Sequence, residues 1–333
     1  MLACLGRSPC TRGVIDEPDW LEQPRDTLRV ERANEAFEAG LVARASRPPP
    51  GVRPDGVAVF GIDNQVSFCH PDGGLYVPGA EEDTQRAARW IVRHADRIDQ
   101  LVFSLDTHRM HQVFHRSWWR TAEGAAPEPL TVIRADDVRG GRFVPADPAE
   151  KERALEYCRK LEATGRYVLT IWPFHGMLGG VSWALMPALV EAALFHAAYR
   201  GQDPRYEMKG QHPLTEHFSV FRPEVEALQG ERLGKFNRNL FDALMRHERV
   251  FVFGQAKSHC VLSTVRDLDE RVEAERPEAL SRLVLLEDAT SPVPPPPSEP
   301  LPPELDFPRI ADEAFEDFRR RGVRIRKTTD AFD

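Results

Sequence analysis

Short apolar runs alternate with amphipathic stretches along most of the chain. Such runs are typical of strands buried on both faces of a parallel sheet. Six strands are expected, at Val57–Ile62, Leu101–Leu105, Tyr167–Trp172, Arg249–Gly254, Arg282–Leu286 and Val323–Ile325. Helices are expected between them, near residues 81–95, 148–164, 231–247 and 312–321. The alternation predicts an α/β protein built on a three-layer, doubly wound, mainly parallel sheet of about six strands, with helices on both faces.

The pattern divides the chain into an extension and one large domain. Residues 1–50 are charged, end in a run of three prolines and show one short helical pattern at 30–43, so we interpret them as an N-terminal extension. Residues 51–333 form the predicted domain, with insertions near 112–147 and 291–303. The second insertion is rich in proline, which lacks an N–H donor, and is therefore predicted to be a loop.

Composition and charge exclude several classes of protein. Apolar residues make up 41% of the chain and charged residues 29%, as in ordinary globular proteins. The 44 basic and 52 acidic residues give a net charge of −8 without a basic stripe, so no nucleic-acid partner is expected. Neither a membrane span nor a signal peptide is recognisable, which favours a cytoplasmic protein. The cysteines are scattered without a C-x-x-C motif, which indicates free thiols. They are Cys4, Cys10, Cys69, Cys158 and Cys260.

Polar side chains follow four of the predicted strands at their carboxyl ends, where parallel sheets bind ligands. Asp63 follows the first strand, and Asp106 and His108 follow the second. His175 follows the third strand and Cys260 the fourth. Each residue alone has an ordinary structural interpretation, as a turn cap, a loop histidine or a small buried thiol. Their occurrence at consecutive strand ends predicts a functional site.

The residues at these strand ends suit nucleophilic chemistry beside a metal. Cys260 opens a predicted helix, where unsatisfied N–H groups favour a thiolate, and Asp63 is a candidate acceptor for its proton. Asp106, His108 and His175 offer one carboxylate and two imidazoles, a ligand set suited to Zn²⁺, Fe²⁺ or Mn²⁺. The pattern therefore predicts a reactive cysteine next to a divalent-metal site.

Five longer motifs occur in one order along the chain. They are VFGIDNQVSFCHPDGGLYVPG at 59–79, SLDTH at 104–108, WPFH at 172–175, MKGQHPLTEHFSVF at 208–221 and VFGQAKSHCV at 252–261. Together they resemble the isochorismatase-like cysteine hydrolase superfamily and, within it, the nicotinamidase-related amidases. The resemblance extends from about residue 57 to the C-terminus, and it implies an isochorismatase-like fold for the domain.

The resemblance implies a catalytic triad of Asp63, Lys209 and Cys260. Lys209 does not stand out from the pattern alone, but beside a thiol its charge would stabilise the thiolate and lower the pKa of the cysteine. A cis peptide bond is implied between Gln255 and Ala256. This turn would direct the N–H groups of Ala256 and Cys260 toward the oxyanion of a tetrahedral intermediate.

The resemblance also assigns the metal ligands to Asp106, His108 and His175, and Phe68 to an aromatic position that flanks the substrate. The sequence departs from the family elsewhere. Gln112 stands where the metal loop often has a second histidine, with His111 and His115 nearby, so no fourth ligand is assigned, and Ser258 replaces a common aspartate. Trp118 and Trp119, in the first insertion, are either walls of the substrate pocket or core residues.

The implied activity is hydrolysis of the C–N amide bond of a small, nicotinamide-like substrate through a cysteine thioester, with the metal orienting the substrate. Two alternatives stay open. One is a metal-independent carbamoyl or ureido amidohydrolase of the same superfamily, and the other is a non-catalytic interaction protein on this fold. The expected partner is a small-molecule amide, and the sequence leaves a homo-oligomer open.

Overall fold

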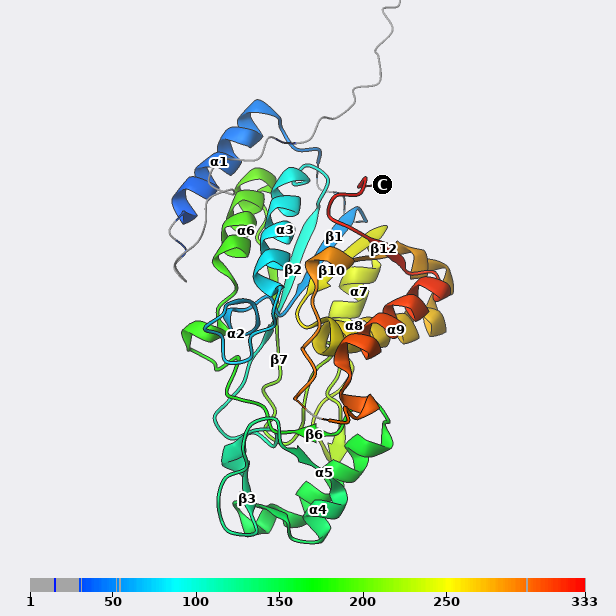
Figure 1. Ribbon diagram of the computed structural model, residues 1–333. Helices are drawn as coiled ribbons and strands as arrows, with labels where there is room; N and C mark the ends of the chain where they lie inside the picture. Colours follow the sequence, from blue (N-terminus) through cyan, green and yellow to red (C-terminus); the bar gives the residue numbers. More distant parts are fainter. Residues whose placement is uncertain are drawn as a thin grey trace, which may run out of the picture.

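The computed structural model describes residues 15, 30, 32–51, 53, 55–297 and 299–332. At its centre is a parallel sheet of six strands in the order β12-β11-β10-β1-β2-β7 (Figure 1). Its strands are β1 (Val57–Ile62), β2 (Gln100–Asp106), β7 (Arg205–Lys209), β10 (Arg249–Gly254), β11 (Leu283–Leu286) and β12 (Arg324–Arg326). The predicted α/β class with a parallel sheet is confirmed.

Helices cover both faces of this sheet (Figure 1). The helices of one face are α3 (Ala80–Arg93) and α6 (Pro187–Arg200), and those of the other are α7 (Arg238–Met245), α8 (Leu262–Glu275) and α9 (Phe307–Arg321). Val57 and Val59 of β1 face the first pair, whereas Ala58 and Phe60 face the second group. This alternation follows from the two-residue period of a strand, and it makes the sheet doubly wound as expected.

A further helix, α1 (Ala33–Ser46), packs against α6. Gly40 permits the close approach, because a Cβ at this position would lie 2.4 Å from the carbonyl oxygen of Phe195. α1 accounts for the helical pattern expected at 30–43, and most of the predicted extension lies outside the described residues. Within the described part of the chain, no helix combines the length and the apolar character that a bilayer crossing requires.

The prediction of a third strand of the main sheet at 167–172 is wrong. Residues 167–172 contribute only β6 (Leu169–Thr170), which pairs antiparallel with β4 (Val132–Ile133) outside the main sheet. The apolar run reflects burial, since Ile171 and Trp172 belong to a hydrophobic cluster. The sheet takes β7 instead, an edge strand whose side chains are partly exposed. An apolar run thus indicates burial but not membership of a sheet.

Two helix predictions also need correction. The helix expected over 231–247 covers only α7, because β9 (Glu231–Arg232) pairs with β8 (Ala227–Leu228) in a small hairpin. Asn237 sets the start of α7, since its side chain accepts a hydrogen bond from the N–H of Leu240. The apolar helix α6 was not predicted.

The first insertion and the helix after it form a lobe, which lies at the bottom of Figure 1. The elements of this lobe are β3 (Trp119–Thr121), α4 (Ala135–Arg139), β5 (Phe143–Pro145) and α5 (Lys151–Ala163), together with β4 and β6. α5 confirms the helix expected at 148–164. The second insertion has neither helix nor strand in its described residues until the short 3-10 helix η8 (Pro303–Leu305), which confirms the predicted loop.

Candidate functional site

Four buried side chains meet at the carboxyl edge of the sheet. Asp63 directly follows β1, while Asp106 and Lys209 end β2 and β7 and lie opposite each other in register. Cys260 comes from η5 (Lys257–Val261), a π-helical turn between β10 and α8. All four residues are at most 5% exposed. The parallel sheet therefore gathers segments that are distant in sequence into one site.

The ammonium group of Lys209 is the centre of the site. Its Nζ atom lies 2.9 Å from Oδ2 of Asp63 and 2.8 Å from Oδ1 of Asp106, and it donates to the carbonyl oxygen of His217 at 2.9 Å. The sulfur of Cys260 is 3.6 Å away. Burial lowers the pKa of Lys209, but the two carboxylates together raise it by a larger amount, so its pKa lies well above its usual value. The side chain is therefore a cation between two buried carboxylates.

Cys260 is a protonated thiol in this resting arrangement. Burial is the main cause that raises its pKa well above the usual value, with Asp63 and Asp106 adding to the rise. Lys209 acts in the opposite direction, as expected from the sequence, but its effect is outweighed. A carboxylate oxygen of Asp63 lies within 4.8 Å of the sulfur of Cys260, and burial also raises the pKa of that carboxyl. The nucleophile thus has a candidate proton acceptor beside it.

Two further residues hold Asp63 and Asp106 in place, and the sequence analysis did not identify either of them. The hydroxyl of Ser104 donates to Oδ1 of Asp63 at 2.6 Å. The side-chain amide of Gln65 bonds the backbone of Asp106 twice, accepting from its N–H at 2.7 Å and donating to its carbonyl at 2.9 Å. Both residues stand within the recognised motifs, but their partners are 41 residues away in sequence. No local sequence pattern predicts hydrogen bonds between residues so far apart.

Asp106, His108 and His175 form a buried group whose potential ligand atoms lie within 4.8 Å of one another. The Nε2 atoms of His108 and His175 are 2.8 and 3.8 Å from Oδ2 of Asp106. Each Nδ1 atom faces a backbone carbonyl instead, that of Gly210 at 3.1 Å and that of Pro173 at 2.7 Å. Carbonyl partners of this kind fix the Nδ1–H tautomer and leave the Nε2 lone pair for a metal.

The protonation and position of His175 also suit a ligand. Burial, as the main cause, lowers its pKa to about 3, so the imidazole is neutral near pH 7. Although the expected strand before it is absent, the loop returns His175 to the sheet edge, because His108 and Met177 form a parallel β-bridge. The three residues therefore fit a divalent transition metal, and Asp106 belongs both to this group and to the carboxylate pair around Lys209.

A further imidazole, His115, borders this group without having been assigned to it. Its ring centroid lies 6.0 Å from that of His108 and 6.3 Å from that of His175. Both ring nitrogens are buried without a hydrogen-bond partner. Gln112, which occupies the motif position, donates its amide to the carbonyl of Gly210 at 2.6 Å. The structure therefore brings His115, and not the residue at the motif position, toward the ligand set.

The remaining predicted residues lie partly beside the ligand set and partly in the core. The peptide bond between Gln255 and Ala256 is cis, as the resemblance implies. Phe68 places its ring edge-to-face against His175 at 5.5 Å. Trp119 is completely buried and donates its indole N–H to the carbonyl of Val113 at 2.6 Å, which fits the core alternative. Trp118 is half-buried and packs against the same hydrophobic cluster.

Loss of a ligand histidine is expected to weaken metal binding. Removal of a residue that only hydrogen-bonds to a metal ligand lowers metal affinity by about 10–100-fold. His108→Ala and His175→Ala remove the ligand itself, so each should lower zinc affinity by more than this. Competition with a chromophoric chelator, followed by elemental analysis of the purified protein, measures the loss. His111→Ala is the matched control, because this exposed histidine lies on the same loop. Full metal retention by both ligand variants would contradict the assignment.

Comparisons with known proteins give matches among solved structures only, since no protein-family model and no curated protein matches the chain. An Acinetobacter baumanii nicotinamidase/pyrazinamidase aligns at 17% identity with a TM-score of 0.48, over 83% of this chain and 98% of that one. A Pyrococcus horikoshii pyrazinamidase in complex with zinc aligns at 18% identity with a TM-score of 0.46, over 82% of this chain and 99% of that one. A yeast nicotinamidase bound to the inhibitor nicotinaldehyde aligns at 16% identity with a TM-score of 0.49, over 81% of this chain and 99% of that one.

Proposed function

We propose that the protein is a cysteine amidohydrolase, which cleaves the C–N bond of a small amide through a thioester on Cys260. The observation that carries the proposal is the set of contacts around the thiol. A carboxylate oxygen of Asp63 lies within 4.8 Å of its sulfur, and the ammonium of Lys209 lies 3.6 Å from it. A nucleophile, its base and a compensating charge are thereby assembled in one water-poor site.

Acylation begins when the thiol proton moves to Asp63 and the sulfur adds to the amide carbonyl carbon. Burial raises the pKa of Asp63 and so strengthens it as a base, while Lys209 offsets the charge that develops on the sulfur. The N–H groups of Ala256 and Cys260 are the proposed donors to the tetrahedral oxyanion. When the C–N bond breaks, the protonated Asp63 gives its proton to the departing nitrogen, which leaves as ammonia or an amine.

Deacylation uses the same residues, with water as the nucleophile and the sulfur of Cys260 as the leaving group. A water molecule adds to the thioester carbonyl and loses a proton to Asp63. The C–S bond then breaks, the carboxylic acid departs, and the proton on Asp63 returns to the sulfur of Cys260. One carboxylate therefore serves as base and acid in both halves, which its position within 4.8 Å of the sulfur supports.

Asp106, His108 and His175 would hold a divalent metal of the zinc, iron or manganese type, which when bound supplies an electrophilic position for a ring nitrogen of the substrate. The protein's own contribution there is orientation. Phe68 contacts His175 edge-to-face and offers a flat apolar surface beside the ligand set. A substrate ring held against this surface would place its amide group toward Cys260.

Ammonia release from nicotinamide and benzamide tests the proposal. Nicotinamide should be hydrolysed with a kcat/KM at least about 100-fold higher, because benzamide has the same shape without the ring nitrogen that the site is built to engage. Enzyme-coupled detection of ammonia with zinc- or manganese-loaded protein measures both rates. Equal rates would contradict orientation through the ring nitrogen. Release from carbamoyl or ureido compounds alone would favour the metal-independent alternative.

A further inference from the structure

The segment of residues 255–261, which we call the nucleophile turn, leads from β10 to α8 and carries Cys260. Its N–H groups at Ala256 and Cys260 are the proposed donors to the oxyanion. In the described part of the chain, the N–H of Ala256 has no hydrogen-bond acceptor, so it is available to a ligand. Such donors act only when they lie about 2.7–3.1 Å from the oxyanion, so the contacts that fix the turn also fix the position of these donors.

The side chain of Gln255 fixes the start of the nucleophile turn. It is fully buried, and both ends of its amide are used. Its Nε2 atom donates to Oδ2 of Asp83 at 2.8 Å, and its Oε1 atom accepts from the N–H of Ser291, the first residue of the second insertion, at 3.2 Å. Asp83 lies on α3 and is itself held by Arg86, which donates to its Oδ1 atom at 2.6 Å. Gln255 thus ties the nucleophile turn both to α3 and to the second insertion.

Ser258 is another point of attachment for the second insertion. Its hydroxyl accepts the N–H of Val293 at 3.1 Å and lies 2.9 Å from Nδ1 of His259. The backbone adds a further link, since the N–H of Lys257 donates to the carbonyl of Ser291 at 2.8 Å. Ser258 stands where the motif commonly has an aspartate, so this chain has a hydroxyl at the position that meets the insertion. These hydrogen bonds join the second insertion to the segment that presents the nucleophile.

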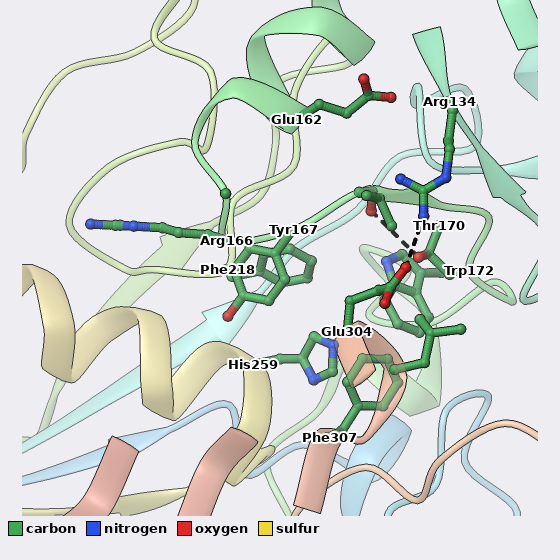
Figure 2. A pocket seen from close by; sticks show the side chains of 13 residues that line it. Arg134, Glu162, Arg166, Tyr167, Thr170, Trp172, Phe218, His259, Glu304 and Phe307 are labelled. Atoms are coloured by element: carbon green, nitrogen blue, oxygen red, sulfur yellow. Dashed lines mark hydrogen bonds and ion pairs between the residues drawn. The ribbon is translucent and has the colours of Figure 1, made fainter. Parts of the chain in front are cut away.

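The chain that follows the second insertion returns to the same turn (Figure 2). Phe307, the first residue of α9, places its ring centroid 4.7 Å from that of His259, which directly precedes the nucleophile. The rings of Phe218 and Tyr167 pack against the same imidazole, with centroids at 5.4 and 5.7 Å. A ring enclosed in this way cannot shift without losing packing contacts. The segment from residue 291 to residue 307 thus contacts the nucleophile turn at both of its ends.

We propose that Asp83, Gln255 and Ser258 are positioning residues, through which α3 and the second insertion hold the proposed oxyanion donors in place. The inference rests on the proposed function, because that function assigns the oxyanion to the nucleophile turn. It extends the function by giving the second insertion a role in catalysis that acts through this turn. Displacement of a catalytic group by about 1 Å can lower a rate about 100-fold, so small shifts of the turn have large effects.

Gln255→Met tests the proposal, because it removes both hydrogen bonds of the amide and nearly keeps the length of the side chain. The kcat for amide hydrolysis should fall about tenfold or more with little change in KM, as expected when an interaction specific to the transition state weakens. Enzyme-coupled detection of ammonia release measures both constants. Gln100→Met is the matched control, since this half-buried glutamine also donates a hydrogen bond, at 2.8 Å to the carbonyl of Leu101, but lies at the amino end of β2. It should keep the wild-type kcat.

Two reactions of the thiol separate positioning from general damage to the site. Pyridine-3-carbaldehyde, the aldehyde that corresponds to nicotinamide, forms a C–S bond with Cys260 while the thiol proton moves to the carbonyl oxygen, which gives a hemithioacetal. This oxygen occupies the place of the oxyanion, so Gln255→Met should weaken aldehyde binding about tenfold or more. Iodoacetamide forms a C–S bond as iodide leaves and the thiol proton passes to Asp63, and because no carbonyl oxygen gains charge, this rate should stay within about threefold of the wild-type rate. Competition between the two reagents, followed by mass spectrometry, measures both.

Two milder variants test the same network. Asp83 accepts from Arg86 on one oxygen and from Gln255 on the other, so Asp83→Asn, with a single acceptor, cannot keep both donors. Ser258→Ala removes the acceptor of the Val293 N–H. Both variants should lower kcat and aldehyde affinity by at least about threefold with unchanged alkylation, and thermal unfolding curves check their fold.

Wild-type kcat and aldehyde affinity in folded Gln255→Met would overturn the inference, as would an equal loss of aldehyde binding and of alkylation. If Gln255→Met does not fold, wild-type values in both milder variants would overturn it instead. In each case, amide hydrolysis by the wild-type protein would keep the proposed function. A wild-type protein that neither hydrolyses an amide nor binds the aldehyde would overturn the proposed function, and the inference with it.

Discussion

Cys260→Ala is expected to lower amide hydrolysis by about 10⁴-fold or more, because no thioester can form without the sulfur. The substitution is small, and the residue lies in the turn before α8, so the fold should be retained. Ammonia release by the purified variant measures the loss, and its thermal unfolding curve checks the fold. Near-wild-type turnover in a folded alanine variant would contradict the mechanism.

Cys158 provides the matched control for this prediction. It is buried in α5 within the inserted lobe, where burial raises the pKa of its thiol to about 12. Cys158→Ala should therefore keep the activity. Iodoacetamide should also label Cys260 before Cys158, since only Cys260 lies in the site that a substrate must reach. Preferential labelling of Cys158 would place the reactive thiol elsewhere.

The central strands could be predicted because burial on both faces leaves a continuous apolar run in the sequence. β1, β2, β10 and β11 all carry such runs and were found within a residue of their bounds. β7 could not be found, because an edge strand with partly exposed side chains has no such run. The run at 167–172 gave the opposite error, because Leu169, Ile171 and Trp172 are buried in the hydrophobic cluster of the lobe without joining the main sheet.

The same distinction explains which site residues the sequence revealed. Asp63 follows β1 and Asp106 ends β2, two strands that could be located, so the strand-end rule identified both residues. Lys209 ends the strand that could not be located, and only the family resemblance identified it. Ser104 and Gln65 were missed, because their importance lies in hydrogen bonds across the sheet that no spacing along the chain reveals.

Lys209→Met is expected to lower the free energy of unfolding by about 3–5 kcal/mol, the usual cost of removing one partner from a buried ion pair. The variant leaves the carboxylates of Asp63 and Asp106 buried without the cation that lies within 3 Å of both. Urea unfolding in the presence of EDTA measures the change, so that bound metal does not contribute. Lys235→Met, at an exposed position, is the control and should change stability by less than about 0.5 kcal/mol. A similar small change in Lys209→Met would contradict the ion-pair assignment.

A double-mutant cycle separates this charge effect from the loss of packing by the lysine side chain. Asp63→Asn removes one of the two buried charges that Lys209 compensates. In the wild-type background it should destabilise the protein, because the remaining amide pairs less well with the ammonium. In the Lys209→Met background it should cost much less or become stabilising, because it removes an uncompensated carboxylate from the interior. The difference between the two backgrounds should reach at least about 1 kcal/mol, within the range observed for residues in one network. Additive effects would mean that the two charges do not stabilise each other, and Lys209 would then lose its role as the compensating charge beside the nucleophile.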